Sequence, residues 1–211
     1  MRLGNGFMTR YSSKSWRTFQ PRTAAGAAAA GPAAAPAPAS IRLVAHDCRV
    51  LGLDPGSQRT GYGIIDCRGS SERHVASGCV DVVGHDMGVR LQRIYAAVSA
   101  LVAEHQPDSV AIERVFVHRN PDSALKLGQA RGVALCAAAS LGASVHEYAP
   151  RAIKMAVTGY GAAGKPQVAQ MVRTLLLLEI KLAADAADAL AVALCHAQTR
   201  RLGALDAIDV A

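Results

Sequence analysis

Apolar residues between positions 49 and 83 fall into three short runs separated by turn-forming residues. The first run, Arg49 to Asp54, is followed by Pro55-Gly56-Ser57, and the other two cover residues 60–66 and 74–83. Short apolar runs bounded by Gly and Pro are typical of strands, and closely connected strands usually pair in antiparallel fashion. The pattern therefore predicts a three-stranded antiparallel meander.

From residue 87 onward the apolar positions follow a helical period instead. Leu91, Ile94, Val98, Leu101 and Val102 recur at intervals of three, four and seven, which predicts an amphipathic helix over residues 87–105. Strands and helices then alternate: strands are predicted at 109–113 and 144–148, and helices at 123–141, 151–157, 166–178 and 184–201. A meander followed by alternating strands and helices predicts an α/β fold in which helices flank a mixed sheet.

Residues 1–46 have a different composition from the rest of the chain. They hold six Lys or Arg residues and no acid, and residues 24–40 contain 11 Ala, three Pro and two Gly. Such low-complexity sequence cannot build a packed core, so we expect a disordered extension, or a start codon assigned too early, before one folded domain over residues 47–205. The alternative is an organellar transit peptide, because the segment is rich in Arg, contains Ser and lacks acids.

The overall composition narrows the class of protein. Hydrophobic residues make up 51% of the chain, which excludes global disorder, and Pro and Gly interrupt the Ala-rich stretch, so no membrane span is expected. The five Cys are scattered without a CxxC pair, which argues against a disulfide framework or a Cys-based zinc site and favours a reducing, cytoplasmic location. The net charge of +7 comes mostly from residues 1–46, so charge alone does not identify a nucleic-acid-binding domain.

Four acids stand out because of their apolar surroundings. Asp54 and Glu113 each end an apolar strand, and Asp185 and Asp188 share one face of an Ala-rich helix. Taken singly, an acid at a strand end can simply be a solvent-exposed residue, and Asp185 can be a capping acid stabilised by the dipole at a helix N-terminus. Taken together, the four form an oxygen-only donor set that suits Mg²⁺ or Mn²⁺, and four carboxylates can hold two ions for phosphoryl displacement.

Five motifs carry a resemblance to a known family. They are Leu51–Ser57 with Thr60–Gly63, Ala111–Phe116, Asp122–Gly132, Thr158–Gly161 with Lys165, and Asp185–Leu190. In this order and spacing they closely resemble the RuvC family of bacterial Holliday-junction resolvases, which are RNase H-like nucleases. The resemblance runs from about residue 49 to about residue 198.

The resemblance implies a homodimeric crossover junction endodeoxyribonuclease of DNA recombination and repair. Such an enzyme binds a four-way DNA junction and nicks two opposed strands symmetrically, with Mg²⁺ as cofactor, two ions per active site and Mn²⁺ as a substitute. Its partners would be the branch-migration proteins RuvA and RuvB. By motif position Asp54, Glu113, Asp185 and Asp188 would be the metal-binding catalytic acids, although some members carry His at the position of Asp185.

The same resemblance assigns residues to the DNA. Phe116 would insert near the junction bases, and Lys154 and the catalytic Lys165 would lie near the scissile phosphate. Phe116 also stands in a polar, basic loop that suits stacking on an unpaired base, although it could equally be a core residue. Lys165 follows a Gly-rich loop at a helix start, which favours phosphate, although a surface Lys would look the same. Further phosphate contacts are predicted at Lys126, Arg131 and Arg173.

Three other functions fit parts of the sequence. Gly52-Leu-Asp54-Pro-Gly56 also resembles a phosphate loop of actin-like or sugar-kinase folds, but about 160 structured residues are too few for their two lobes. A non-catalytic junction-binding protein would not need all four acids, and an RNase H-like nuclease acting on RNA or hybrids would share them. The chain departs from the family at Glu179-Ile180-Lys181, where many members have Pro ahead of the aspartate pair.

Overall fold

A computed structural model of the 211-residue chain describes residues 47–114, 121–140 and 142–206. The predicted residue Phe116 and the segment 1–46 lie outside the described residues. The helices and strands follow one another as β1 (Cys48–Pro55), β2 (Arg59–Arg68), β3 (Ser71–Asp81), α1 (Met87–His105), β4 (Ser109–Glu113), α2 (Pro121–Ser140), β5 (Ser144–Tyr148), α3 (Pro150–Thr158), α4 (Lys165–Leu175) and α5 (Ala184–Asp206).

The strands form one mixed sheet in the order β3-β2-β1-β4-β5. β1, β2 and β3 pair as an antiparallel meander, and β4 pairs in parallel with both β1 and β5. The predicted α/β class, with an antiparallel meander and parallel strands in one mixed sheet, is therefore confirmed. Because β1 and β4 run in the same direction, their carboxyl ends lie at one edge of the sheet, and these ends are Asp54-Pro55 and Glu113.

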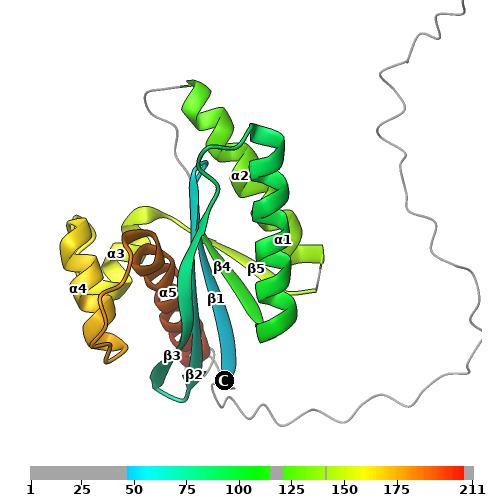
Figure 1. Ribbon diagram of the computed structural model, residues 1–211. Helices are drawn as coiled ribbons and strands as arrows, with labels where there is room; N and C mark the ends of the chain where they lie inside the picture. Colours follow the sequence, from blue (N-terminus) through cyan, green and yellow to red (C-terminus); the bar gives the residue numbers. More distant parts are fainter. Residues whose placement is uncertain (1–46, 115–120, 141, 207–211) are drawn as a thin grey trace, which may run out of the picture. The chain divides into compact units, whose positions relative to one another are not determined.

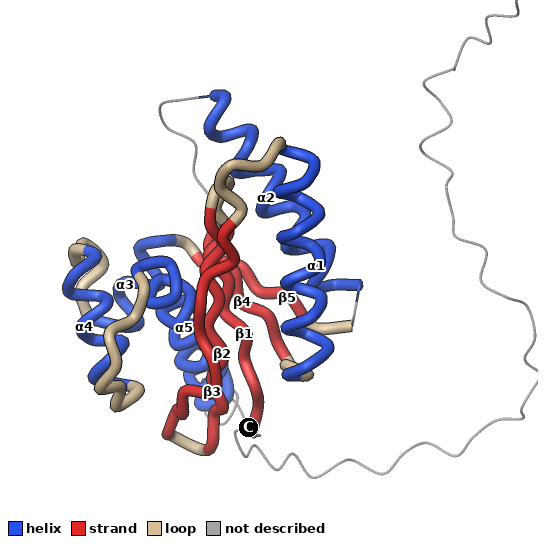
Figure 2. Tube along the Cα trace, viewed as in Figure 1, coloured by secondary structure: helices blue, strands red, loops and turns tan. Residues whose placement is uncertain are grey.

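Helices cover both faces of the sheet (Figures 1 and 2). α1 and α2 lie on one face, while α3, α4 and α5 lie on the other. Neighbouring strand residues point to opposite faces, so Leu51 and Ile64 pack towards α1 and α2, whereas Val50 and Ile65 pack towards α5. The sheet thus separates two apolar cores, and α5 is the central helix of one of them, with its residues from Ala189 to Cys195 buried.

α5 packs on the sheet at positions where the strands carry glycine. A Cβ atom added to Gly52 would lie 2.1 Å from the Ala189 carbonyl oxygen, and one added to Gly61 would lie 2.0 Å from that of Asp185. A Cβ on Gly63 would lie 2.6 Å from Leu190 Cγ. Side chains at these three positions would therefore push α5 away from β1 and β2, because packed atoms do not approach so closely. The glycines set the height of α5 above the sheet.

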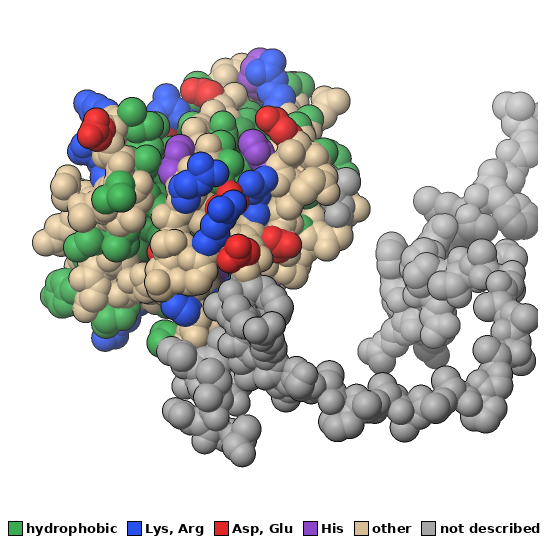
Figure 3. Space-filling view, turned by 90° about the horizontal axis from the view of Figure 1, so that it is seen from below, with side chains coloured by type: hydrophobic (Ala, Val, Ile, Leu, Met, Phe, Trp, Pro, Cys, Tyr) green, Lys and Arg blue, Asp and Glu red, His purple; other side chains and the backbone are tan. Residues whose placement is uncertain are grey.

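The opposite end of the sheet is rich in ion pairs. Asp66 accepts from Arg49 at 2.7 Å and lies 3.5 Å from Arg73, and Arg201 pairs with Glu72. Seen from this end, Lys and Arg side chains are interspersed with Asp and Glu (Figure 3). These contacts pair basic with acidic side chains locally and give this end no strong excess of positive charge.

The helix boundaries agree with the sequence prediction to within one or two residues, except at the ends of α4 and α5. α4 ends at Leu175 instead of residue 178, because Leu177 takes a left-handed backbone conformation with φ 53°. α5 continues to Asp206 instead of residue 201. None of the helices within the described ranges combines the length and apolarity needed to span a bilayer. All five cysteines lie within the described residues and are free.

Replacing Gly61 with Ala tests the packing of α5. The new methyl group would overlap the Asp185 backbone, so the free energy of unfolding should fall by about 1–3 kcal/mol, as measured by urea denaturation. Gly128→Ala on α2 is the matched control, because a Cβ there meets nothing within 4 Å. Since Ala is the better helix former, the control should gain about 0.5–1 kcal/mol. Equal midpoints for the two variants would contradict the packing role of Gly61.

Candidate active site

The four acids come from three elements that meet at the carboxyl edge of the sheet. Asp54 belongs to β1 and Glu113 ends β4, while Asp185 and Asp188 lie in the first two turns of α5. α5 begins above this edge, because Asp185 packs over Gly61, which pairs with Asp54 across the strands. All four carboxylates are half-buried. The structure therefore brings together residues that are 134 positions apart in sequence.

The charges of these acids act on one another. Burial, and then the negative charges of Asp188, Glu113 and Asp185, together raise the pKa of Asp54 to about 7, against the opposing effect of Lys165. Burial, and then the charge of Asp188, also raises the pKa of Glu113, while Lys165 and Lys154 oppose the rise. Carboxylates that hinder each other's ionisation form a site that is short of positive charge.

Two lysines supply part of that positive charge. Lys165 Nζ donates to Asp188 Oδ2 at 2.7 Å, although 79% of the lysine side chain stays exposed. Lys165 begins α4, where Gln167 Oε1 accepts a hydrogen bond from Gly164 N at 2.8 Å and fixes the turn into the helix. Lys154 of α3 lines a pocket of about 210 Å³ together with Glu113, Lys165 and Asp188. Both lysines therefore place positive charge beside the acids.

Asp185 is held by a residue that sequence reasoning missed. Asp54, Gly61 and Cys79 form one row across β1, β2 and β3, because Asp54 pairs with Gly61 and Gly61 pairs with Cys79. Cys79 Sγ donates to Asp185 Oδ2 at 3.5 Å. Nothing around Cys79 in the sequence signals this contact, since it depends on the register of β2 and β3.

The orientation of α5 also favours the acids. The helix N-terminus carries partial positive charge, and Asp185 lies in the first turn of α5. The backbone of α5 therefore stabilises the ionised form of carboxylates gathered at its start. This effect is modest, about 0.3–1 kcal/mol at an exposed helix end, and cannot balance four charges by itself.

The donor chemistry fits a hard divalent cation, although the side chains are not arranged as a closed ligand set. Among the described residues, no three His, Cys, Asp or Glu side chains lie in an arrangement that could enclose a metal ion. Asp188 pairs with Lys165 and Asp185 with Cys79. Oxygen donors that repel one another suit Mg²⁺ or Mn²⁺, and the carboxylates would have to reorient to bind either.

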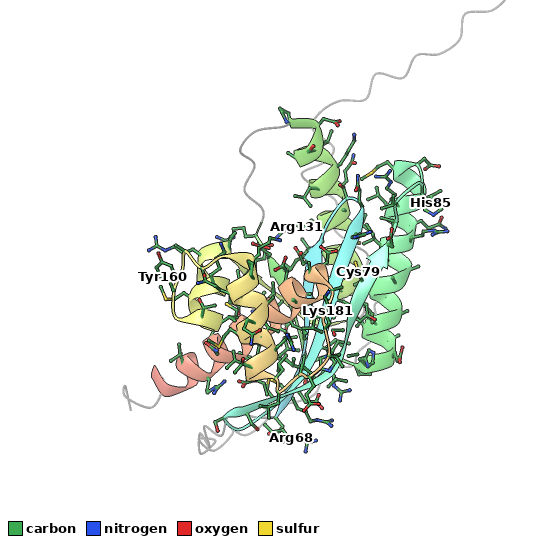
Figure 4. All side chains as sticks on the ribbon, turned by 60° about the vertical axis from the view of Figure 1, so that its left-hand side comes forward. Arg68, Cys79, His85, Arg131, Tyr160 and Lys181 are labelled. Carbon is green, nitrogen blue, oxygen red and sulfur yellow. The ribbon has the colours of Figure 1, made fainter. Side chains whose placement is uncertain are left out.

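The other predicted DNA contacts lie apart from the acids or have partners of their own. Lys126 is exposed on α2 and pairs with Asp122 at 2.6 Å. Arg173 lies eight residues beyond Lys165 on α4, about 12 Å along the helix axis, and its Nε is buried without a hydrogen-bond partner. Arg131 donates to the Glu113 carbonyl oxygen at 3.2 Å. Figure 4 shows Arg131 and Cys79 towards one end of the sheet and Arg68 at the other.

Comparison with known proteins identifies relatives over most of the chain. Residues 50–196 match the family described as "Crossover junction endodeoxyribonuclease RuvC". The protein of that name from Alkalilimnicola ehrlichii is 54% identical over 163 residues, which cover 74% of this chain and 99% of the relative. The protein of the same name from Dichelobacter nodosus is 54% identical over 150 residues, which cover 71% of this chain and 85% of the relative.

The fold also matches a solved structure. T. thermophilus RuvC in complex with a Holliday junction substrate superposes with a TM-score of 0.70 at 36% sequence identity, covering 74% of this chain and 97% of that chain. The resemblance predicted from the five sequence motifs is therefore confirmed.

Burial of Asp54 and repulsion from its acidic neighbours predict a pH-dependent stability in metal-free protein. The ordinary pKa of Asp54 is near 3.8 and its folded value is about 7, so between these values the folded protein holds a proton that the unfolded chain has released. The free energy of unfolding of the wild type should then fall as pH rises. The Asp54→Asn variant has no titrating group at this position. Its free energy of unfolding relative to that of the wild type should therefore rise by about 2 kcal/mol from pH 5 to pH 8.

Urea denaturation in EDTA at both pH values measures this difference. His196, whose burial lowers its pKa to about 4, titrates in both proteins and cancels in the comparison. A stability difference that stays constant between pH 5 and pH 8 would show that Asp54 is not held in a strained, charged cluster.

Proposed function

The chain belongs to the RuvC family of crossover junction endodeoxyribonucleases, and from this premise we propose that it resolves four-way DNA junctions by nicking two opposed strands symmetrically. The observation that carries the proposal is the meeting of Asp54, Glu113, Asp185 and Asp188 at one edge of the sheet beside Lys165. A cluster of acids flanked by lysines suits phosphodiester hydrolysis, because it can bind cations and an anionic backbone together.

The family implies dependence on a divalent metal, and we propose Mg²⁺ as the physiological ion, with two ions per active site and Mn²⁺ as a substitute. The four acids would hold the ions, which when bound supply activation of a water molecule and stabilisation of the leaving 3′ oxygen. The raised pKa of Asp54 supports this assignment, because the positive charge of a cation would offset both the burial and the repulsion that raise it.

The protein's own groups prepare the site for DNA. Lys165 is anchored at the start of α4 and reaches the acids with a mostly exposed side chain, so its ammonium group can hold a non-bridging oxygen of the scissile phosphate. Lys154 flanks the same pocket from α3 and can hold an adjacent phosphate. Lys126 and Arg173 are proposed as outer contacts to the DNA backbone, and affinity for DNA should fall steeply with salt.

Symmetric cutting requires two active sites related by a twofold axis, so we propose a homodimer. Two identical sites match the symmetry of a four-way junction, in which opposed strands present equivalent phosphates. The partnership with RuvA and RuvB stays a prediction, as do the cytoplasmic location and the organellar alternative.

A synthetic four-way junction tests the proposal. With Mg²⁺ the wild type should nick one pair of symmetry-related strands and leave ligatable ends, while a linear duplex of the same sequence is cut poorly. Asp54→Asn should reduce the cleavage rate by at least about 10³-fold and keep junction binding, because it removes a proposed ligand and not a DNA contact. An Asp54→Asn protein that cuts at the wild-type rate would remove Asp54 from the mechanism, and ATP hydrolysis without DNA would favour the kinase-like alternative.

Phe116→Ala tests the predicted contact with the junction centre. Loss of the ring should slow junction cleavage by about tenfold or more and leave affinity for linear duplex within about twofold, because only the junction offers unpaired bases for stacking. Phe116→Tyr should retain most of the activity. An unchanged cleavage rate for Phe116→Ala would assign the side chain to packing.

A further inference from the structure

Arg131 reaches from α2 to the end of the catalytic strand β4. Its Nε donates to the Glu113 carbonyl oxygen at 3.2 Å, and its Nη2 lies 2.9 Å from Glu147 Oε1 on β5. Only 18% of the side chain is exposed, and Nη2 itself is buried. Arg131 thus contacts the last residue of β4 and the second-last residue of β5, and a guanidinium held in this way has little surface left for a phosphate.

The carbonyl of Glu113 needs this donor because of Pro55. Arg114 N donates to Tyr148 O at 2.7 Å, so the backbone polar groups of Arg114 face β5 and, by alternation, those of Glu113 face β1. Leu53 of β1 pairs with Ile112 of β4, so the next pair along the two strands is Asp54 and Glu113. In a parallel ladder, the carbonyl of a residue accepts a hydrogen bond from the N–H of the residue that follows its partner. For Glu113 that residue is Pro55. Proline has no N–H, so β1 cannot provide that hydrogen bond.

Glu147 completes the arrangement. It lies 2.9 Å from Arg131 Nη2 and 3.8 Å from Arg114 Nε, and 40% of its side chain is exposed. The carboxylate therefore holds the guanidinium from the β5 side while Nε binds the Glu113 carbonyl. β4 ends at Glu113, and its last residue is held on the β5 side by the bond from Arg114 N to Tyr148 O and at its own carbonyl by Arg131.

We propose that Arg131 is a positioning residue: it replaces the hydrogen bond that Pro55 cannot donate, fixes the end of β4, and so aims the Glu113 carboxylate into the acid cluster. This role replaces the phosphate contact predicted from the sequence. It rests on the proposed nuclease function, since Glu113 matters only if the cluster is the active site. A partner that orients a metal-binding side chain typically affects metal affinity or activity by about 10–100-fold when it is removed.

Three variants separate positioning from DNA binding. Arg131→Met removes both contacts, Arg131→Lys keeps the charge but lacks the fork that reaches Glu113 and Glu147 together, and Glu147→Gln weakens the support for Arg131. Arg93→Met, on the exposed side of α1, is the matched control for loss of an arginine. Lys126→Met serves as the comparator for a lost phosphate contact.

The measurements are the single-turnover junction cleavage rate with enzyme in saturating excess, junction affinity in EDTA at several salt concentrations, and Mn²⁺ affinity of DNA-free protein by calorimetry. Arg131→Met should cut about 10–100-fold more slowly and bind Mn²⁺ more weakly, with junction affinity and its salt dependence unchanged. The cleavage rate and Mn²⁺ affinity should fall almost as far in Arg131→Lys and less far in Glu147→Gln. Arg93→Met should match the wild type in both measurements.

Two results would overturn the proposal. In the first, Arg131→Met weakens junction binding and lowers the slope of log affinity against log salt concentration by about one, as expected for Lys126→Met, while the cleavage rate at saturating enzyme stays normal. Arg131 would then be a phosphate contact. Alternatively it could lower only the unfolding midpoint, with normal rate and Mn²⁺ affinity, which would assign it to stability. If the wild type cuts no junction, the proposed function fails, and the Mn²⁺ titration still tests Arg131.

Discussion

Direct packing of α5 against the glycines of β1 and β2 is the constraint on which the site depends. Gly52, Gly61 and Gly63 place no side chain of their own between strand and helix, so α5 packs directly against the strand backbone. At that height Asp185 and Asp188 are close enough to Asp54 for their charges to raise its pKa. The same glycines therefore complete one core of the protein and bring a helix-borne pair of acids to a strand-borne pair.

Gathering four acids in this way costs stability, and the fold offsets only part of the cost. Burial and mutual repulsion disfavour ionisation of Asp54 and Glu113, whereas the N-terminus of α5 and the ammonium group of Lys165 favour it. The remaining deficit of positive charge is what a divalent cation would fill. The site is thus built at the expense of stability in the metal-free protein, as is common where chemistry needs strained charges.

Local sequence patterns were enough to predict the strands, the helices and the four acids. Apolar periodicity located every element, and the acids were visible because they interrupt apolar runs at Asp54, Glu113 and Asp188. The end of α4 was misplaced, because the apolar run continues through Leu178 while the backbone turns at Leu177. Periodicity reports which side chains can be buried and not where the backbone changes direction.

Contacts that depend on register could not be predicted from the sequence. Cys79 reaches Asp185 only because β2 and β3 pair Gly61 with Cys79. Arg131 donates to the Glu113 carbonyl at the place where β1 continues with Pro55, which has no N–H to donate. Phe116 lies outside the described residues, so its role stays a prediction.

The most direct test of the central claim is anomalous scattering from a crystal soaked in Mn²⁺. The account predicts a peak about 2.1 Å from carboxylate oxygens of Asp54 and at least one of its three acidic neighbours, whereas a peak elsewhere, or none at saturating Mn²⁺, would contradict it.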